Sequence, residues 1–453
     1  MYITTFSLAF MFFVLGLFFI CRKELRVYIL GVASIYYAFH VSRNTCVGII
    51  CITGLSYLCG LLIYHLKNKK LSKALFFISI TCLSGSLLYF KYINYPLLAI
   101  GYSYFCFQAI SYIADIEKEK TVPINNPIRL IVFFAWFPKL VSGPIERIDT
   151  FNADIERIKD VSLTDKGRIK KSVTYIFAGC FYKLVLADRI SPLVDEIFDM
   201  PHIYQLEILI IGILLFTIQI YCDFAGYSLV AIGISNLFGI NLTENFSSPY
   251  FSTTISEFWK RWHISLTNWL RDYIYIPLGG NRKGKLCLFI NLMIVFLLSG
   301  IWHGNGIGFV LWGLIHGLLS ILDRIIKIKN RLLGWILTFC SVSFAWMFFK
   351  AASLERVVMY LQAMIANNKS FPISAQLTQL GVDYLEVVIA IIALVVIIII
   401  DLGIKKYKSL EGYINNISLV RWCVLMWILI MSVVIFGIYG PSFEGGRMIY
   451  MQF

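Results

Sequence analysis

The chain has 453 residues, of which 59% are hydrophobic and 15% are charged, so it is too apolar for a soluble protein. Apolar runs recur along its whole length and predict a polytopic helical membrane protein in a lipid bilayer. The formal net charge of +14 suggests a nucleic-acid partner, but Lys and Arg lie in short clusters between the apolar runs, which argues against one. The eleven cysteines are scattered and indicate neither a disulfide framework nor a zinc site.

The first part of the chain is a series of apolar segments at residues 4–20, 29–40, 45–64, 74–90 and 97–114. Basic clusters follow the first and the third of these segments, at residues 22–26 and 67–73. Placing both clusters in the cytoplasm puts the N-terminus outside. We expect residues 4–20 to be the first span and not a signal peptide, because no basic residue precedes them.

The middle of the chain is more varied. Residues 128–141 are apolar but too few to cross a bilayer, and prolines follow, so we predict a re-entrant or interfacial segment. Residues 146–171 read as a cytoplasmic loop, and spans are expected at 173–186 and 206–222. An amphipathic, glycine-rich segment follows at 226–239, and interfacial helices are expected over 252–285.

The last part begins with a helix from residue 286 that breaks at residues 304–308 and returns over 309–322. It ends at a third basic cluster, residues 323–331, which we also place in the cytoplasm. Three further spans, at 333–349, 384–401 and 420–438, would leave the C-terminus outside.

The chain has six histidines. His40, His65 and His202 fall at span ends, where a solvated imidazole is ordinary. His303 differs, because it lies beside a glycine break within an apolar hairpin, and a histidine in such a run is a functional-site hypothesis by default. It is either a satisfied structural histidine or a general base toward a hydroxyl acceptor.

His263 follows a run of aromatic and basic residues. One interpretation is a solvated interfacial helix with aromatic anchors. The other is an electropositive mouth that accepts a phosphorylated cofactor, with Lys260, Arg261, Arg271 and Arg282 as hydrogen-bond donors. Spacing alone does not choose between them.

Other chemistry finds little support. Asp223 is expected to end a span and to cap or pack, with a supporting role at most. His303 and His316 are thirteen residues apart without a HExxH motif, so we predict no metal site. The residues alone therefore predict a membrane protein with a buried histidine tunnel and a basic cytoplasmic mouth.

Several motifs resemble one known family. Residues 257–266, 271–280 and 301–304 resemble the membrane-bound O-acyltransferase family, and within it the bacterial branch of alginate O-acetyltransferase membrane subunits. Residues 101–112, 137–147 and 218–228 fit the same branch in the same order. The resemblance covers almost the whole chain.

The resemblance implies an all-α, polytopic integral membrane fold of about eleven or twelve transmembrane helices, with re-entrant or interfacial helices around a central tunnel. It implies a single domain over residues 1–453: N-terminal spans to residue 120, a catalytic core over 121–331, and C-terminal spans with an extracytoplasmic tail. His303 matches the family's essential histidine, and His263 matches a second important one.

The implied reaction is transfer of an acetyl group from cytoplasmic acetyl-CoA, used as a donor substrate with no bound cofactor. The expected partners are an extracytoplasmic SGNH-type transferase and a cell-envelope or secreted polysaccharide, at a bacterial cytoplasmic membrane. Transfer of D-alanine to teichoic acid is the second reading, although residues 273–282 look like the acetyl branch. A transporter or flippase is the alternative from another class, but the paired broken helices of transporters are not found.

The C-terminal tail, residues 447–453, contains Tyr450. It is either an amphipathic anchor at the outer interface or an acyl carrier. In the second case His303 deprotonates the Tyr450 hydroxyl as it attacks the thioester, and the acyl-tyrosine passes its acetyl group to the SGNH partner. The tail resembles the ending of the acetyl branch, with Met448 and Met451 in place of aromatic residues.

Overall fold

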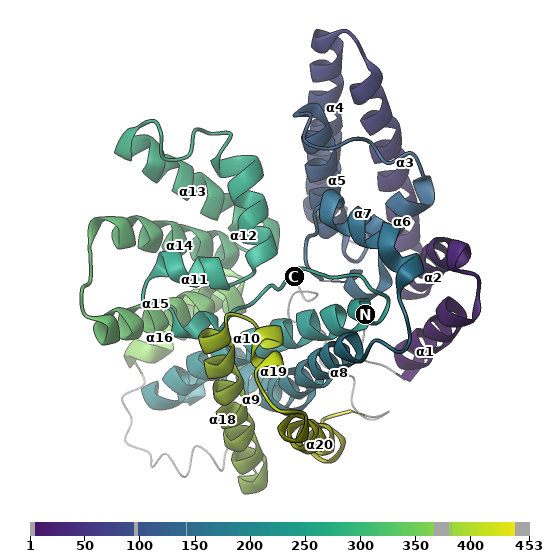
Figure 1. Ribbon diagram of the computed structural model, residues 1–453. Helices are drawn as coiled ribbons and strands as arrows, with labels where there is room; N and C mark the ends of the chain where they lie inside the picture. Colours follow the sequence, from purple (N-terminus) through teal and green to yellow (C-terminus); the bar gives the residue numbers. More distant parts are fainter. Residues whose placement is uncertain (1–4, 95–97, 142, 367–379, 382, 440–453) are drawn as a thin grey trace. The chain divides into compact units, whose positions relative to one another are not determined.

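A computed structural model describes residues 5–94, 98–141, 143–366, 380–381 and 383–439 (Figure 1). The regular structure of these residues is helical, without a β-strand. Within these residues, eight helices are long and apolar enough to cross a membrane, and the shorter apolar helix at residues 6–20 precedes them. The prediction of an all-α polytopic membrane protein is confirmed.

The chain forms two compact units, and two helices, α8 (Lys166–Cys180) and α10 (Leu206–Leu237), contribute residues to both. The first unit comprises residues 1–176 and 228–244. Its other helices are α1 (Thr5–Ile20), α2 (Arg26–Val41), α3 (Arg43–His65), α4 (Lys69–Leu88), α5 (Tyr102–Glu117), α6 (Pro127–Ala135) and α7 (Ile148–Arg157).

The second unit comprises residues 177–227 and 245–453. Its other α-helices in the described residues are α9 (Asp188–Asp199), α11 (Ile255–Arg261), α12 (Ile264–Leu270), α13 (Gly284–His303), α14 (Ile307–Ile325), α15 (Arg331–Ala351), α16 (Leu354–Ala366), α18 (Tyr384–Tyr407), α19 (Leu410–Asn415) and α20 (Leu419–Phe436).

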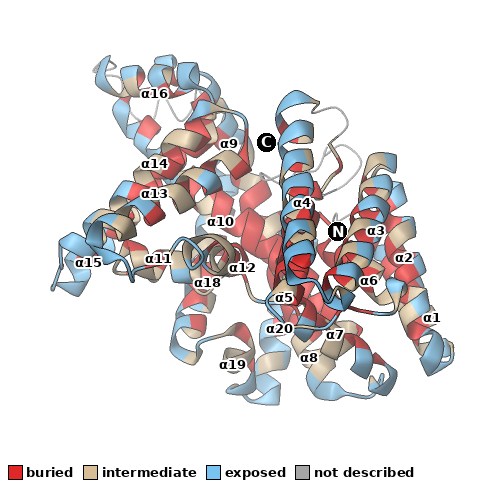
Figure 2. Cartoon of the chain, turned by 90° about the horizontal axis from the view of Figure 1, so that it is seen from above, coloured by how far each residue is buried: buried red, intermediate tan, exposed pale blue. Residues whose placement is uncertain are grey.

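The helices differ in how far the chain itself covers them. In its most apolar stretch, α10 is 72% buried, whereas α18 is 22% and α20 is 11% buried. Figure 2 shows α10 mostly in red and α4 largely in pale blue. Because α18 exposes apolar residues such as Ile391 and Ile392, its outer face is suited to contact with lipid chains.

The helix α10 is longer than predicted. It continues through residues 226–237, which we expected to form a separate segment after a span ending at residue 222. A Cβ on Gly226 would lie 2.7 Å from the Gly179 carbonyl oxygen, and one on Gly233 would lie 2.8 Å from that of Ser172. The glycines therefore allow close approach to α8 without ending the helix.

The short apolar segment after residue 126 is confirmed as too short to cross. The helix α6 has nine residues, about 14 Å, against a hydrocarbon core of about 30 Å. It begins at Pro127, and the Asn126 side chain accepts a hydrogen bond from the Ile128 amide at 2.9 Å. A 3₁₀ turn, Phe137–Lys139, follows it.

The prediction of a loop over residues 146–171 is wrong in part, because α7 and the start of α8 lie within it. The helix α7 is amphipathic and buries Ile148, Phe151 and Ile155. The many charged residues of this stretch hid the 3.6-residue spacing of these three side chains.

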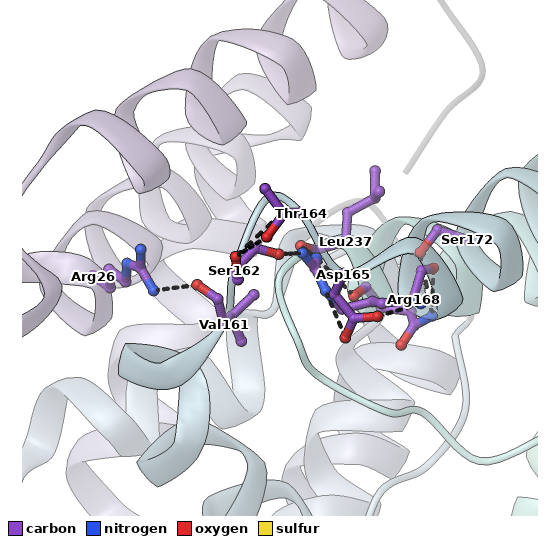
Figure 3. Close-up of polar contacts among 9 residues, drawn as sticks. Arg26, Val161, Ser162, Thr164, Asp165, Arg168, Ser172 and Leu237 are labelled. Carbon is purple, nitrogen blue, oxygen red and sulfur yellow. Dashed lines mark hydrogen bonds and ion pairs between the residues drawn. The ribbon is translucent and has the colours of Figure 1, made fainter.

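Two buried or half-buried arginines tie the end of this stretch to its surroundings (Figure 3). The Arg26 guanidinium donates to the carbonyl oxygens of Ile158 at 2.8 Å, Val161 at 3.0 Å and Phe18 at 3.1 Å. The Arg168 guanidinium donates to the carbonyl oxygens of Leu237 and Ser162. The segment between α7 and α8 is therefore held by two guanidinium groups that donate hydrogen bonds to backbone carbonyl oxygens.

Candidate active site

His303 is the last residue of α13 and is buried among aromatic rings. The ring centroids of Trp302, Phe349 and Trp312 lie 4.7, 5.0 and 5.1 Å from the imidazole centroid. These rings come from α13, α15 and α14, so three helices enclose the imidazole. The predicted position of His303 at a helix break is confirmed, because α13 ends there and α14 begins at Ile307.

The packing of α13 against α14 depends on two glycines. A Cβ on Gly300 would lie 2.3 Å from the Phe309 carbonyl oxygen, and one on Gly313 would lie 2.4 Å from that of Phe296. No side chain larger than hydrogen fits at either position without moving the backbone. The close approach brings Trp312 of α14 to His303.

His263 lies between the short helices α11 and α12. Its backbone is left-handed, with φ +44° and ψ +55°, a conformation that costs a non-glycine residue about 1–2 kcal/mol. The side chain is buried, and its ring meets that of Phe224 edge-on at 4.7 Å. It does not lie on a solvated helix face, so the solvated interfacial interpretation does not hold for this residue.

Burial lowers the pKa of His263 to about 3, so its imidazole is neutral at pH 7. A neutral imidazole has one nitrogen that donates and one that accepts a hydrogen bond. It can therefore orient a polar group without carrying charge into the buried site.

Trp302 connects the two predicted histidines. Its ring centroid lies 4.7 Å from that of His303 and 6.3 Å from that of His263. The structure thus brings together two residues that are forty positions apart in the sequence. Trp312 likewise contacts both His303 and His316, at 5.1 and 4.9 Å.

His316 is fully buried among aromatic residues. Trp259 and Trp312 each lie 4.9 Å from its ring centroid, and Trp346 lies 6.1 Å away. Neither imidazole nitrogen has a hydrogen-bond partner among the residues that the structure describes. Its position supports a packing role beside the Trp312 ring.

The four predicted donor-binding cations differ in their surroundings. Arg261 pairs with Glu257 at 2.6 Å, and Arg271 pairs with Asp272 at 2.8 Å. Lys260 and Arg282 are exposed, and within the described part of the chain neither has an ion-pair partner. Of these four cations, Lys260 and Arg282 therefore carry charge that no carboxylate of the described residues offsets.

The remaining predictions have mixed outcomes. His40, His65 and His202 are exposed at the ends of their elements, as expected. Asp223 lies within α10 and not at a span end, and its carboxylate pairs with Lys183 at 2.5 Å. Tyr450 lies outside the described residues.

Buried polar residues that the sequence did not single out lie around the site in the second unit. Asn245 is buried and accepts hydrogen bonds from the backbone and side chain of Ser265 at 3.2 and 2.7 Å. The Asp401 carboxylate accepts hydrogen bonds from the hydroxyls of Tyr182 and Tyr221, each at 2.9 Å. A carboxylate in a membrane-crossing helix was the one available signal for Asp401; Asn245 had none.

The first unit holds two buried charged side chains, Glu146 and Lys139. The Glu146 carboxylate accepts hydrogen bonds from the Thr243 amide and hydroxyl at 2.6 and 3.0 Å. The Lys139 ammonium lies over the rings of Phe133 and Phe151 at 5.2 and 5.4 Å.

Among the described residues, no group of three or more His, Cys, Asp and Glu side chains is placed to hold a metal ion.

Three relatives illustrate the range of proteins that the chain is similar to. A probable alginate O-acetylase AlgI of Azotobacter vinelandii is 34% identical over 330 residues, which is 70% of this chain and 63% of the relative. A peptidoglycan O-acetyltransferase of Helicobacter pylori is 33% identical, over 60% of this chain and 58% of the relative. A teichoic acid D-alanyltransferase of Bacillus subtilis is 30% identical, over 52% of this chain and 62% of the relative.

The chain spans less than two thirds of the length of each of these relatives. A sequence profile of the membrane-bound O-acyltransferase family (MBOAT) matches residues 124–354, which is just over half of the chain. The match includes His263 and His303 together with the helices that enclose them. The helical membrane fold and the aromatic enclosure of a histidine at the α13–α14 turn are thus found in a chain that belongs to the membrane-bound O-acyltransferase family.

Proposed function

We propose that this protein transfers an acetyl group from cytoplasmic acetyl-CoA to a hydroxyl acceptor, for O-acetylation of a cell-envelope or secreted polysaccharide. The observation that carries the proposal is His303, an imidazole enclosed by Trp302, Trp312 and Phe349 at the end of a membrane-crossing helix. Relatives named as O-acetylases support the acetyl group and the polysaccharide class. The proposed location is a bacterial cytoplasmic membrane.

His303 acts as the general base in this proposal. The acceptor hydroxyl oxygen attacks the thioester carbonyl carbon while its proton passes to an imidazole nitrogen of His303. The carbon–sulfur bond then breaks, and the imidazolium returns the proton to the leaving CoA sulfur. The products are an O-acetyl ester and CoA, and His263 orients the donor side of the site.

The donor enters past the cations on the helices and turns after residue 259. Lys260 and Arg282 are exposed and face no carboxylate partner in the described residues, so they suit the phosphate groups of CoA. Arg261 and Arg271 contribute less charge, because Glu257 and Asp272 offset them. The acetyl thioester then extends toward His303.

Tyr450 is the proposed first acceptor. Its hydroxyl takes the acetyl group as an ester, and an extracytoplasmic SGNH-type partner transfers the group to the glycan. A carrier of this kind solves a geometric problem, because the donor stays in the cytoplasm while the final acceptor is a bulky polymer outside.

Two other functions compete with this proposal. Relatives named teichoic acid D-alanyltransferases, at 30–31% identity, favour D-alanyl transfer as the second candidate. A membrane transporter or flippase would move an unmodified substrate across the bilayer and form no covalent product.

The test is transfer of label from acetyl-CoA, radiolabelled in the acetyl group, to the purified protein in liposomes with and without an SGNH-type partner and glycan. We expect covalent label in the wild type and a loss of at least about 10²–10⁴-fold in rate for His303→Ala. Tyr450→Phe removes only the hydroxyl and should abolish labelling of the chain. His65→Ala, at an exposed helix end, is the matched control and should behave as wild type.

Three results would overturn parts of the proposal. Near-normal transfer by well-folded His303→Ala would remove the assigned base. Label from a D-alanyl donor but none from acetyl-CoA would establish the second candidate. Full glycan acetylation by Tyr450→Phe would leave that tyrosine as an anchor.

A further inference from the structure

Two segments of the second unit, residues 245–248 and 261–265, are paired through their backbones. The Ser247 amide donates to the Arg261 carbonyl oxygen at 3.0 Å, and the Ile264 amide donates to the Asn245 carbonyl oxygen at 3.0 Å. These two hydrogen bonds lie on either side of His263. We call residues 245–248 the clamp segment.

The Asn245 side chain adds a second layer of contacts. Its Oδ1 atom accepts hydrogen bonds from the Ser265 amide at 3.2 Å and from the Ser265 hydroxyl at 2.7 Å. Ser265 is in the first turn of α12, where backbone amides have no partner within the helix. Asn245 therefore fixes the start of the helix for which His263 is the N-cap residue.

His263 needs such support because its backbone is in the left-handed region. A left-handed conformation costs about 1–2 kcal/mol for a residue with a Cβ and persists only where the surroundings impose it. Such strained residues cluster at functional sites. The described contacts that impose it here are the hydrogen bonds of the clamp segment to residues 261, 264 and 265.

The clamp segment is itself attached to a membrane-crossing helix. The Ser248 hydroxyl donates to the Asp401 carbonyl oxygen of α18 at 2.7 Å. The Asp401 carboxylate holds the Tyr221 hydroxyl, and the Tyr221 ring centroid lies 6.1 Å from that of Trp262, the neighbour of His263. The clamp segment and Trp262 are thus both linked to Asp401 of α18.

We propose that Asn245 is a positioning residue for His263, which acts through the backbone and not by touching substrate. This inference rests on the proposed acetyl transfer only where the rate of that transfer is measured. It predicts that loss of the Asn245 side chain lets the His263 turn relax and moves its imidazole away from the ring of Trp302. A displacement of about 1 Å in a catalytic group can cost about 10²-fold in rate.

The rate experiment is a double-mutant cycle with His263→Ala. Asn245→Ala should lower kcat by about 10–10²-fold with little change in the KM for acetyl-CoA. In the His263→Ala background, Asn245→Ala should lower kcat by less than about twofold, because the imidazole that Asn245 positions is absent. Asn245→Asp keeps an oxygen at the acceptor position and should recover most of the rate.

The matched control is Asn268→Ala, the same substitution within α12 at a residue that takes no part in the hydrogen bonds described above for the clamp segment. It should leave kcat close to the wild-type value. An equal loss from Asn245→Ala in both backgrounds would show that Asn245 only maintains the fold, and the proposal would be wrong. Should Asn245→Ala fail to fold, Ser265→Ala removes one of the two donors and enters the same cycle.

A second measurement does not depend on acyl transfer. Hydrogen–deuterium exchange of the peptide that contains Ser265 should be faster in Asn245→Ala and close to wild type in Asn245→Asp, because only alanine removes the amide's acceptor. Unchanged exchange in Asn245→Ala would overturn the clamp. If wild-type protein transferred no acetyl group while exchange behaved as expected, the proposed function would fail and the structural part of this inference would stand.

Discussion

The neutral imidazole of His263 makes stability depend on pH. Its pKa is lowered to about 3 by burial, whereas an unfolded histidine titrates near about 6.5. Between these values the unfolded chain binds a proton that the folded chain does not. The contribution to stability is therefore complete above about pH 6.5 and is lost as the pH falls toward about 3.

This difference predicts a measurable change between pH 7 and pH 5. Wild-type protein should lose about 2 kcal/mol more of its free energy of unfolding over this interval than His263→Gln, which has no imidazole to protonate. Reversible unfolding in detergent at the two pH values measures it. Parallel losses in the two proteins would contradict a buried neutral imidazole.

At this scale the sequence located the histidines but not what holds them. His303 and His263 were found from a glycine break and an aromatic–basic run, which are local patterns. The contact of Trp302 with both rings and the hydrogen bonds of Asn245 to Ser265 join residues far apart in the chain. Such contacts depend on how the helices pack against one another, and the spacing of residues along a single sequence does not predict them.

Among the elements, the connection between α7 and α8 depends on Arg26. From the sequence we placed this arginine in a cytoplasmic basic cluster; in the structure it is buried and donates to backbone carbonyl oxygens of residues 158–161. Losing a charged donor of this kind leaves buried acceptors unsatisfied.

Arg26→Ala should therefore lower the free energy of unfolding by about 2 kcal/mol or more. Arg26→Lys should recover only part of the loss, because one ammonium cannot reproduce the planar, several-donor geometry of guanidinium. Arg22→Ala, at an exposed position in the same cluster, serves as the control. If the two alanine variants unfolded alike, the arrangement in Figure 3 would not stabilise the protein.

Most of the long apolar helices could be predicted from composition with bounds that agree within a few residues, but α10 continues fifteen residues beyond its expected end at residue 222. The α13–α14 hairpin was found from its glycines. The same glycine signal was misleading in α10, where Gly226 and Gly233 permit close packing and do not end the helix. The helix α7 was not predicted because it has few apolar residues, and the charged residues between them made the stretch resemble a polar loop.

For the whole molecule, the orientation in the membrane remains a prediction. The basic clusters at residues 22–26, 67–73 and 323–331 should be cytoplasmic, with both termini outside. In a background that lacks the eleven native cysteines, an impermeant thiol reagent added outside should miss Lys69→Cys and modify Gln452→Cys. The opposite labelling would reverse the direction of acyl transfer as well.

The length of α10 has a consequence for the membrane in which the protein works. Its 32 residues measure about 48 Å, some 18 Å more than a hydrocarbon core of about 30 Å. The surplus is taken up by tilt or by projection beyond the lipid chains, and Arg168 satisfies carbonyl oxygens at its last turn. Because tilt is set by packing against neighbouring helices, and α10 is 72% buried by the chain itself, the protein holds the angle of this helix. A bilayer of another thickness therefore has to adapt to α10, at fractions of a kcal/mol per Å.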